Sequence, residues 1–296
     1  MTKLLLTSDI VYLDKNKYTF HIYDTESQKT YSMPYIKELD TDIDESVAGR
    51  PSWRPFGITK TLDHIYISNN SKIMKFNITD FSIDSILSDN GVINTHQIKN
   101  DGKFIYRSNT SNDTVSKIDI RTGEQIHFDF KTMKKIDDLV PPKHYKIQDE
   151  FHINSFHQFR TSLFVLANNL NKKRSELYVL DKSFDSCMKI TDLGYHCHEL
   201  IFDGRTIYTF SSGQGLMIEL NFNDMTLDYM ELEDPDKYFL RGATLNDGKI
   251  YVFANQLRKN FNKNSPVKLL TIDLDNDNIL EEEIPEFGLI CAVESL

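Results

Sequence analysis

The sequence predicts an all-β fold, a six-bladed β-propeller in which the C-terminal strand joins the N-terminal blade. Three observations support this prediction: a degenerate internal repeat, a hairpin turn in each repeat, and a single strand segment left over at the C-terminus. The repeats begin at Pro55, His96, His152, His198 and Arg241, which are 41, 56, 46 and 43 residues apart. A period of about 40 to 50 residues with three or four strands is typical of propeller blades.

The elements within each repeat follow a common order. A short apolar segment comes first, then a turn such as Asn-Asp-Gly or Phe-Asp-Gly, then an alternating strand that often begins Ile-Tyr. A polar loop and a third alternating strand follow. Asp-Gly between alternating segments is a strong hairpin signal. A large sandwich or jelly roll also explains the strands and turns, but it does not explain the fixed period.

The two ends of the chain complement one another. Segments 10–16, 17–24 and 29–36 predict three strands of a blade that lacks a first strand, and segment 287–296 predicts a strand without partners. We expect this last strand to be the innermost strand of the first blade, because such closure removes an open sheet edge. Segment 131–150, with its Pro-Pro pair and its charges, predicts a surface insertion between blades in a single domain of residues 1–296.

Composition and charge exclude several classes of protein. The formal net charge is −10 and the isoelectric point is near 5.4, which disfavours binding to nucleic acid or to an anionic membrane surface. The three cysteines have no CxxC spacing, and the three leucines near the N-terminus are too few for a signal peptide or a membrane span. These features predict a reduced, cytoplasmic compartment. The motifs of P-loop kinases, Rossmann dehydrogenases and α/β-hydrolases are absent from the sequence.

The acidic segment 273–283 resembles a calcium-binding loop at first reading. Asn278 stands where such a loop needs glycine, and Ile284 stands where it needs a bidentate glutamate. A solvated hairpin is the simpler interpretation.

Alignment of the repeats places His96, His152, His198 and Arg241 at equivalent positions, where the innermost strand of each blade begins. Innermost strands surround the axial channel of a propeller, so we expect these side chains to meet at one mouth of the channel. Three neutral imidazoles with an open position suit a Zn, Mn or Fe ion, so the predicted metal ligands are His96, His152 and His198. His196 shares a strand face with His198 and is a substitute ligand.

Two other interpretations of the histidines stay open. They could form a polar ring that contacts substrate without a metal, or they could only form hydrogen bonds to channel water and neighbouring blades. Arg241 is suited to bind a carboxylate or phosphate through two N–H groups, although it could instead form a salt bridge to Glu199 or Glu294. Further side chains expected at the same mouth, as substrate contacts, are those of Asn154, Glu199, Asn168, Ser211, Gln214, Asn255 and Arg258.

The order of these motifs resembles an uncharacterised bacterial six-bladed β-propeller family of conserved hypothetical proteins. The counterparts here are His96-Gln97-Ile98, Phe151-His152-Ile153-Asn154, Cys197-His198-Glu199, Ser212-Gly213-Gln214-Gly215 and Leu240-Arg241-Gly242, within residues 90–296. Phe151, Cys197 and Leu240 stand where the family pattern has Cys, Pro and Thr. The resemblance implies the propeller fold and this set of residues, and it implies no particular reaction.

The function expected from the sequence is that of a metal-dependent enzyme, a lyase or hydrolase, acting on a small polar or anionic molecule. His198 and Arg241 are the expected catalytic residues, and the cofactor is a divalent metal ion. The alternative is a non-enzymatic propeller that binds a protein or carbohydrate partner, with segment 131–150 as the expected contact.

Overall fold

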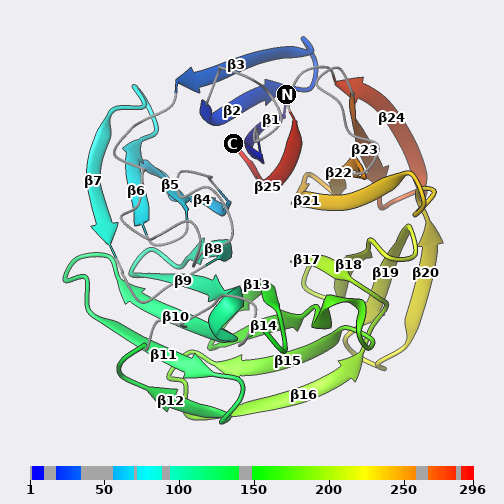
Figure 1. The fold of residues 1–296 in the computed structure, drawn as a ribbon. Coiled ribbons are helices and arrows are strands. Elements are labelled where there is room, and N and C mark those ends of the chain that lie inside the picture. The colour runs from blue at the N-terminus through cyan, green and yellow to red at the C-terminus, as the bar shows by residue number, and fades with distance from the viewer. Residues whose placement is uncertain are drawn as a thin grey trace. The chain divides into compact units, whose positions relative to one another are not determined.

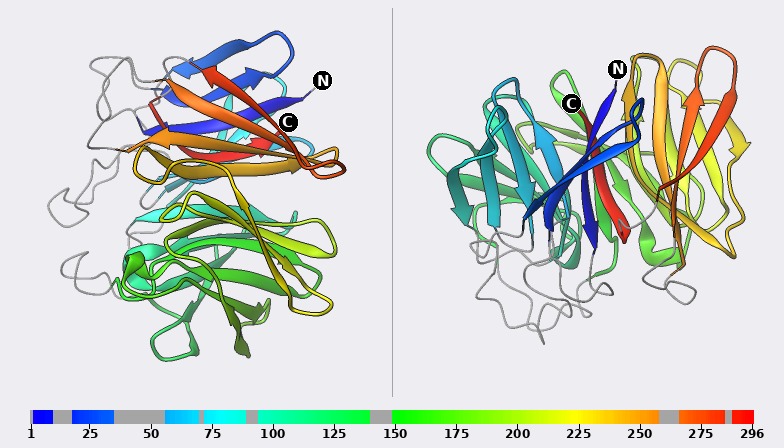
Figure 2. Two further views of the ribbon diagram at one scale, coloured as in Figure 1. Left: turned by 90° about the vertical axis from the view of Figure 1, so that its right-hand side faces the viewer. Right: turned by 90° about the horizontal axis from the view of Figure 1, so that it is seen from above.

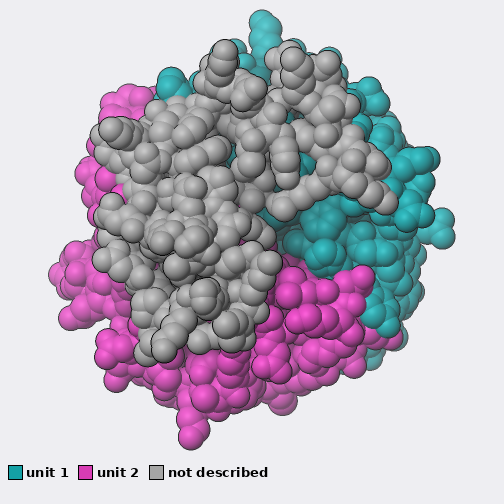
Figure 3. All heavy atoms as spheres, viewed as in Figure 1, with its two compact units in different colours: residues 1–36, 193–296 teal, residues 37–192 magenta. Residues whose placement is uncertain are grey.

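The chain folds into six antiparallel sheets and has almost no helix, which confirms the six-bladed β-propeller predicted from the repeat (Figure 1). The computed structural model describes residues 2–9, 18–34, 56–69, 72–88, 94–139, 149–257, 266–284 and 288–296. The blades fall into two compact units, residues 37–192 and residues 1–36 with 193–296, which Figure 3 distinguishes by colour. We describe each unit by itself.

The unit of residues 37–192 contains blades 2, 3 and 4. Blade 2 consists of β4 (Ile58–Lys60), β5 (His64–Ser68), β6 (Lys72–Asn77) and β7 (Ile83–Ser88). Blade 3 consists of β8 (Thr95–Asn100), β9 (Phe104–Asn109), β10 (Thr114–Asp119), β11 (Gln125–Asp129) and β12 (Lys134–Ile136). Blade 4 consists of β13 (Ile153–Phe159), β14 (Ser162–Ala167), β15 (Glu176–Asp181) and β16 (Cys187–Asp192).

The other unit contains blades 5, 6 and 1. Blade 5 consists of β17 (Cys197–Phe202), β18 (Thr206–Ser211), β19 (Leu216–Asn221) and β20 (Leu227–Glu231). Blade 6 consists of β21 (Tyr238–Asn246), β22 (Lys249–Gln256), β23 (Val267–Asp273) and β24 (Asn278–Ile284). Blade 1 has the order β25–β1–β2–β3, with β25 (Leu289–Ser295), β1 (Lys3–Asp9), β2 (Tyr18–Asp24) and β3 (Lys29–Pro34).

The predicted closure of blade 1 is confirmed, because β25 pairs antiparallel with β1 and the two lie side by side (Figure 2). The position of the second strand was predicted wrongly. That strand is β1, which contains the three N-terminal leucines, whereas the predicted segment 10–16 lies outside the described residues. Leu4, Leu5 and Leu6 are fully buried, so this apolar segment is core strand. The predicted hairpin at 273–283 is confirmed by the pairing of Asp273 with Asn278.

The Asp-Gly…Ile-Tyr pattern of the repeat has a physical explanation in blades 3 and 5. In blade 3 the Asp101 carboxylate accepts the backbone N–H of Phe104 at 2.8 Å and the hydroxyl of Tyr106 at 3.1 Å. In blade 5 Asp203 accepts the N–H of Thr206 at 2.8 Å and the hydroxyl of Tyr208 at 2.9 Å. One carboxylate therefore fixes both the turn and the register of the strand that follows it.

Each first strand except β4 is involved in a register shift. One extra residue lies between Thr95 and Ile98 in β8, and corresponding shifts occur in β13, β17, β21 and β25. Such β-bulges leave a residue outside the ladder and re-aim side chains. The shifts fall at or next to the residues singled out by the repeat alignment.

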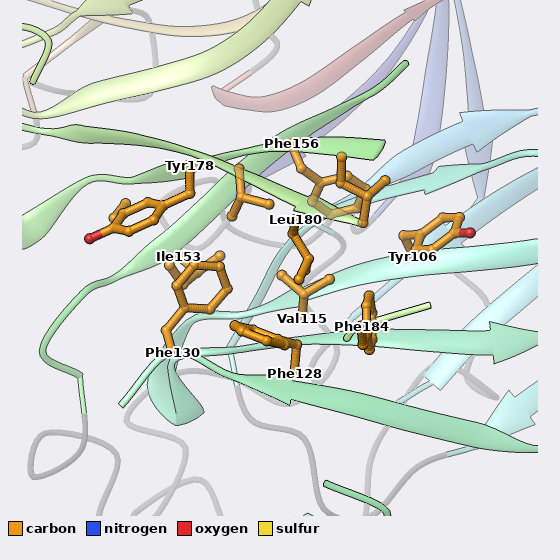
Figure 4. Packing of buried hydrophobic residues seen from close by; sticks show 12 residues of the cluster. Tyr106, Val115, Phe128, Phe130, Ile153, Phe156, Tyr178, Leu180 and Phe184 are labelled. Atoms are coloured by element: carbon orange, nitrogen blue, oxygen red, sulfur yellow. The ribbon is translucent and has the colours of Figure 1, made fainter. Parts of the chain in front are cut away.

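Blades 3 and 4 share an apolar core (Figure 4). Val115, Phe128 and Phe130 of blade 3 pack with Ile153 and Phe156 of blade 4. Ile153 directly follows His152, so burial of the isoleucine fixes the backbone beside this histidine.

Segment 131–150 is only partly described, because residues 140–148 lie outside the described ranges. Residues 134–136 form β12, a fifth strand that pairs with β11. The three cysteines all lie within the described ranges and form no disulfide. Among the described residues, no helix has the length and apolar character needed to cross a membrane.

His21 predicts a pH dependence of stability. It is buried between two hydroxyls, with Ser8 Oγ 3.0 Å from Nε2 and Ser32 Oγ 2.8 Å from Nδ1. Burial lowers the pKa of His21 to about 4, against about 6.5 in the unfolded chain. Because the folded pKa is the lower one, the unfolded chain gains the proton first as the pH falls. The free energy of unfolding is therefore expected to fall by about 2 to 3 kcal/mol between about pH 7 and about pH 4.5 through this group.

Urea unfolding of the wild type and of His21→Gln at both pH values measures this contribution. The variant is expected to lose correspondingly less stability on acidification. Leu62→Gln, which changes an exposed side chain without a titrating group, is the control and should keep the wild-type difference. Equal pH dependence of the wild type and His21→Gln would contradict the prediction.

Candidate functional site

Two histidines from neighbouring blades meet in the unit of residues 37–192. His96 lies in β8 and His152 immediately precedes β13, and their ring centroids are 5.0 Å apart in an edge-on arrangement. Phe56, just before β4, stacks on the other side of His96 at 5.6 Å. All three residues are buried. The repeat positions of blades 2, 3 and 4 therefore lie next to one another.

Asp149 orients the ring of His152. Its two carboxylate oxygens lie 2.8 and 3.0 Å from Nδ1 of His152, and both side chains are largely buried. A carboxylate at Nδ1 accepts the proton there, so the neutral ring carries its lone pair on Nε2. This arrangement suits a general base, and it equally suits a metal ligand, since metal-binding histidines commonly donate their other N–H to a carboxylate.

Asp113 holds the segment that carries this pair. Its buried carboxylate accepts backbone N–H groups from Glu150 at 2.7 Å, Phe151 at 3.0 Å and His152 at 2.8 Å, and Lys131 lies 3.3 Å away. Burial raises the pKa of Asp113 to about 6, although these donors favour the charged form. The three hydrogen bonds support His152 in a left-handed conformation with φ of 52°.

The second histidine cluster lies in the other unit. His198 of β17 has its Nδ1 3.0 Å from the backbone oxygen of His196 and 3.2 Å from Oγ of Ser212. The Ser212 hydroxyl donates to the backbone oxygen of Leu240 at 2.6 Å, so its oxygen is left to accept from His198. Nδ1 of His198 therefore carries the proton, and the lone pair of the neutral ring is on Nε2.

Aromatic contacts hold the rings of this cluster. Phe239 of β21 packs edge-on against His198 at 4.7 Å and against His196 at 5.1 Å. The two imidazole centroids are 5.1 Å apart. His196, the substitute ligand of the sequence prediction, is thus adjacent to His198.

Arg241 and Glu199 occupy the bulges of β21 and β17. Arg241 donates from Nε to the backbone oxygen of Cys291 at 3.2 Å, which ties blade 6 to β25. Glu199 accepts the N–H of Gly242 at 3.3 Å. In the other unit, Gln97 of β8 accepts the N–H of Phe156 in β13 at 2.6 Å. Gln97 and Glu199 therefore make the same kind of blade-to-blade hydrogen bond.

Several predicted substrate contacts take part in such structural bonds. Asn255 accepts the N–H of Ile290 at 2.7 Å, and Asn168 accepts the N–H of Leu170 at 3.0 Å. The Ser211 hydroxyl donates to the backbone oxygen of Tyr195 at 2.8 Å, and Gln214 accepts the N–H of Tyr195 at 3.1 Å. Asn154 is buried at the bulge of β13, and Arg258 lies outside the described residues. Their role in substrate binding stays a prediction.

The predicted metal site also stays a prediction. His96 and His152 lie in one unit and His198 in the other. Across residues 2–296, leaving out the gaps between the described ranges, no group of three or more His, Cys, Asp or Glu side chains is arranged to hold a metal ion.

Repeat alignment did not identify three residues of these clusters. Asp149 lies at the end of the insertion, where there is no counterpart in other blades. Asp113 follows a short 3₁₀ turn at 110–112, and Phe239 precedes the aligned position in β21. Phe56 directly follows Pro55, the start of the first repeat, so the repeat itself was the signal for this residue.

Loss of the Asp113 carboxylate is expected to disturb the position of His152, because the carboxylate binds the backbone of this segment rather than the imidazole ring. Asp113→Ala leaves three buried N–H groups without their acceptor, and we expect a loss of about 3 kcal/mol in the free energy of unfolding. Asp113→Asn keeps one side-chain carbonyl oxygen, and asparagine tolerates the left-handed backbone conformation of residue 113. The free energy of unfolding should therefore fall by about half as much. Urea unfolding measures stability, and ¹⁵N NMR of the imidazole reports the proton on Nδ1 of His152.

Asp119→Asn is the matched control, because Asp119 caps two N–H groups of a surface turn. It should leave the His152 ring spectrum unchanged. An unchanged His152 ring spectrum in Asp113→Ala would show that the three hydrogen bonds to Asp113 do not position this histidine.

No family model matches the chain, and no curated protein matches it. The solved structures show the fold. A chain of a nidogen/laminin complex is 11% identical, with a TM-score of 0.68 over 100% of this chain and 98% of that one. A protein of unknown function from Bacteroides caccae is 12% identical, with a TM-score of 0.67 over 100% and 98%. A protein from Lactobacillus plantarum is 12% identical, with a TM-score of 0.61 over the whole of both chains.

Proposed function

We propose that the protein is an enzyme of the lyase or hydrolase type that acts on a small polar or anionic molecule. The observation that supports this most is the state of two buried histidines. In His152 and in His198, Nδ1 is engaged by an acceptor, so each neutral ring presents Nε2 as a base or a ligand. A neutral ring in this tautomer has its lone pair on Nε2, which is the atom that a base or a metal ligand uses.

The two histidines differ in what holds them. Asp149 is a carboxylate and stabilises the imidazolium that forms when His152 takes a proton, as in the nucleophile–base–acid arrangement of hydrolases. His198 is held by a backbone carbonyl and a hydroxyl, which stabilise its positive form less. We therefore assign the base role to His152 and a binding or polarising role to His198. Arg241 would orient the anionic group of the substrate.

A divalent metal ion, Zn, Mn or Fe, is part of this proposal. The ligands predicted from the sequence, which the experiment below tests, are His96, His152 and His198, and a bound metal would acidify a water molecule or polarise a carbonyl group. The Asp149 carboxylate behind His152 fits this chemistry, because second-shell carboxylates raise the basicity of metal-binding imidazoles.

Metal analysis of the purified full chain, followed by equilibrium dialysis with Zn²⁺, Mn²⁺ and Fe²⁺, tests the metal. About one ion per chain is expected, with uptake lost in His152→Ala and His198→Ala and weakened roughly 10- to 100-fold in Asp149→Asn. His64→Ala is the control and should bind like the wild type. If the purified protein carries no ion and binds none of Zn²⁺, Mn²⁺ and Fe²⁺, the proposed metal site is wrong.

The reaction is tested separately with a panel of small carboxylate esters, phosphate esters and uronic acids, followed by ¹H NMR. Turnover of a panel member should fall by about 10²-fold or more in His152→Ala. Arg241→Met should raise KM chiefly, because it removes binding of the anionic group. Turnover that is indifferent to His152, His198 and Arg241 would place the chemistry elsewhere.

A second candidate function is that of a binding module for a protein or carbohydrate. Large apolar side chains are exposed on the last strands of three blades, at Met188, Tyr229 and Leu280. The chain of the nidogen/laminin complex is a propeller neighbour in a protein complex, which supports the same idea. Binding to an immobilised glycan panel that persists in His152→Ala and His198→Ala would favour the module over the enzyme.

A further inference from the structure

A small cavity lies between blades 2 and 3, within the unit of residues 37–192. Its volume is about 150 Å³. Ile73, Leu87 and Ile118 form apolar walls, while Arg107 and Gln125 contribute the polar groups. Ile86 and Gly123, at its edge, are partly exposed, so the cavity is open to solvent on one side.

Arg107 is a charged residue at a buried strand position. It lies in β9, the second strand of blade 3, and is 1% exposed. The second strands of the other described repeats carry uncharged buried residues at the corresponding position, namely Ile67, Val165, Thr209 and Val252. Arg107 is therefore the charged member of this set of five equivalent positions. Placing a guanidinium in an apolar core is costly unless an anion or several acceptors compensate it.

The direction of Arg107 follows from strand alternation. Ile105 and Arg107 are two residues apart and share one face of β9. Ile105 packs with Tyr66, Ile73 and Ile118 in the core between blades 2 and 3. Arg107 thus faces the same core and lines the cavity in it. Its five N–H donors allow it to hold a carboxylate through two of them while other donors serve the protein.

Gln125 supplies the complementary group. It lines the cavity, and its buried Oε1 has no hydrogen-bond partner within the described part of the chain. A buried acceptor without a donor costs free energy, which a hydroxyl group on a ligand would recover. The cavity thus offers a cation for a carboxylate, an acceptor for a hydroxyl, and apolar walls for a short carbon chain.

We propose that this cavity is a binding site for a short-chain hydroxycarboxylate, distinct from the histidine clusters. An apolar cavity of this volume holds a molecule of about benzene's size, so a ligand of about four carbons fits. The carboxylate binds Arg107, the hydroxyl donates to Gln125, and the chain contacts Ile73, Leu87 and Ile118. The site needs no metal and no catalytic residue.

Methyl NMR of the full chain, labelled at isoleucine δ1 and titrated with 3-hydroxybutyrate, tests the site. The Ile73 and Ile118 methyl signals are expected to shift with a dissociation constant in the millimolar range or tighter, while those of Ile250 and Ile272 in the other unit stay in place. Butyrate lacks the hydroxyl and should bind about 3- to 10-fold more weakly, and 3-hydroxybutyramide lacks the charge and should bind about 10-fold more weakly or worse.

Three variants separate the two polar contacts. Arg107→Met places an apolar residue where other blades have one, so it should fold, and it should abolish the shifts at Ile73 and Ile118. Gln125→Leu should bind 3-hydroxybutyrate only as well as butyrate. Arg205→Met, in an exposed turn of the other unit, is the control and should bind like the wild type.

No shift of the Ile73 and Ile118 signals at about 20 mM 3-hydroxybutyrate would overturn the site. Equal binding of 3-hydroxybutyrate by the wild type and by Arg107→Met would also overturn the site. Equal binding of 3-hydroxybutyrate and of 3-hydroxybutyramide by the wild type would do the same. Butyrate binding as tightly as 3-hydroxybutyrate would remove Gln125 from the site and overturn the hydroxycarboxylate assignment. These outcomes do not depend on metal uptake or turnover, so they are distinguishable from failure of the proposed enzyme.

Discussion

The extra residue in the first strand of a blade is the constraint on which the candidate site depends. A bulge takes one residue out of the ladder, so its backbone groups need partners elsewhere and its side chain turns to a new direction. At Gln97 the Ser108 hydroxyl of β9 meets that need. The redirected side chains of Gln97 and Glu199 each accept an N–H from the first strand of the next blade. The histidines beside these residues therefore lie next to the bonds that join neighbouring blades. A change at Gln97 or Glu199 is expected to disturb both the blade contact and the position of the adjacent histidine.

The two histidine clusters reach the same tautomer by different routes. His152 depends on a carboxylate from an insertion and on the backbone clamp of Asp113, whereas His198 depends on Ser212 and a main-chain oxygen. The first arrangement places a negative charge next to an imidazole, and the second does not. The two imidazoles therefore differ in the charge of the group that their Nδ1 contacts, and the proposed division between a base and a binding group rests on this difference.

Local signals made most of the fold predictable. Asp101 and Tyr106 show why: the turn and the following strand are fixed by one side chain five residues away, so the pattern is visible in a short stretch of sequence. Closure by β25 followed from a strand without partners. The second strand of blade 1 was missed because a run of leucines has no alternation when both strand faces are buried. Asp113 escaped prediction because it acts on backbone groups 37 to 39 residues further along the chain. Asp149 lies only three residues before His152, but it ends an insertion that has no counterpart in other blades, so a repeat alignment does not show it.

Blade 1 is built from both ends of the chain, and this has a consequence during synthesis. The leucines of β1 leave the ribosome first, yet their partner strand β25 appears some 280 residues later. At ordinary translation speeds this is a delay of about 15 to 60 s, during which an apolar edge stays uncovered. The described strands of blades 2, 3 and 4, by contrast, pair only with strands of the same blade, each drawn from one stretch of sequence. Blade 1 therefore waits for the far end of the chain to complete its sheet, whereas blades 2, 3 and 4 do not.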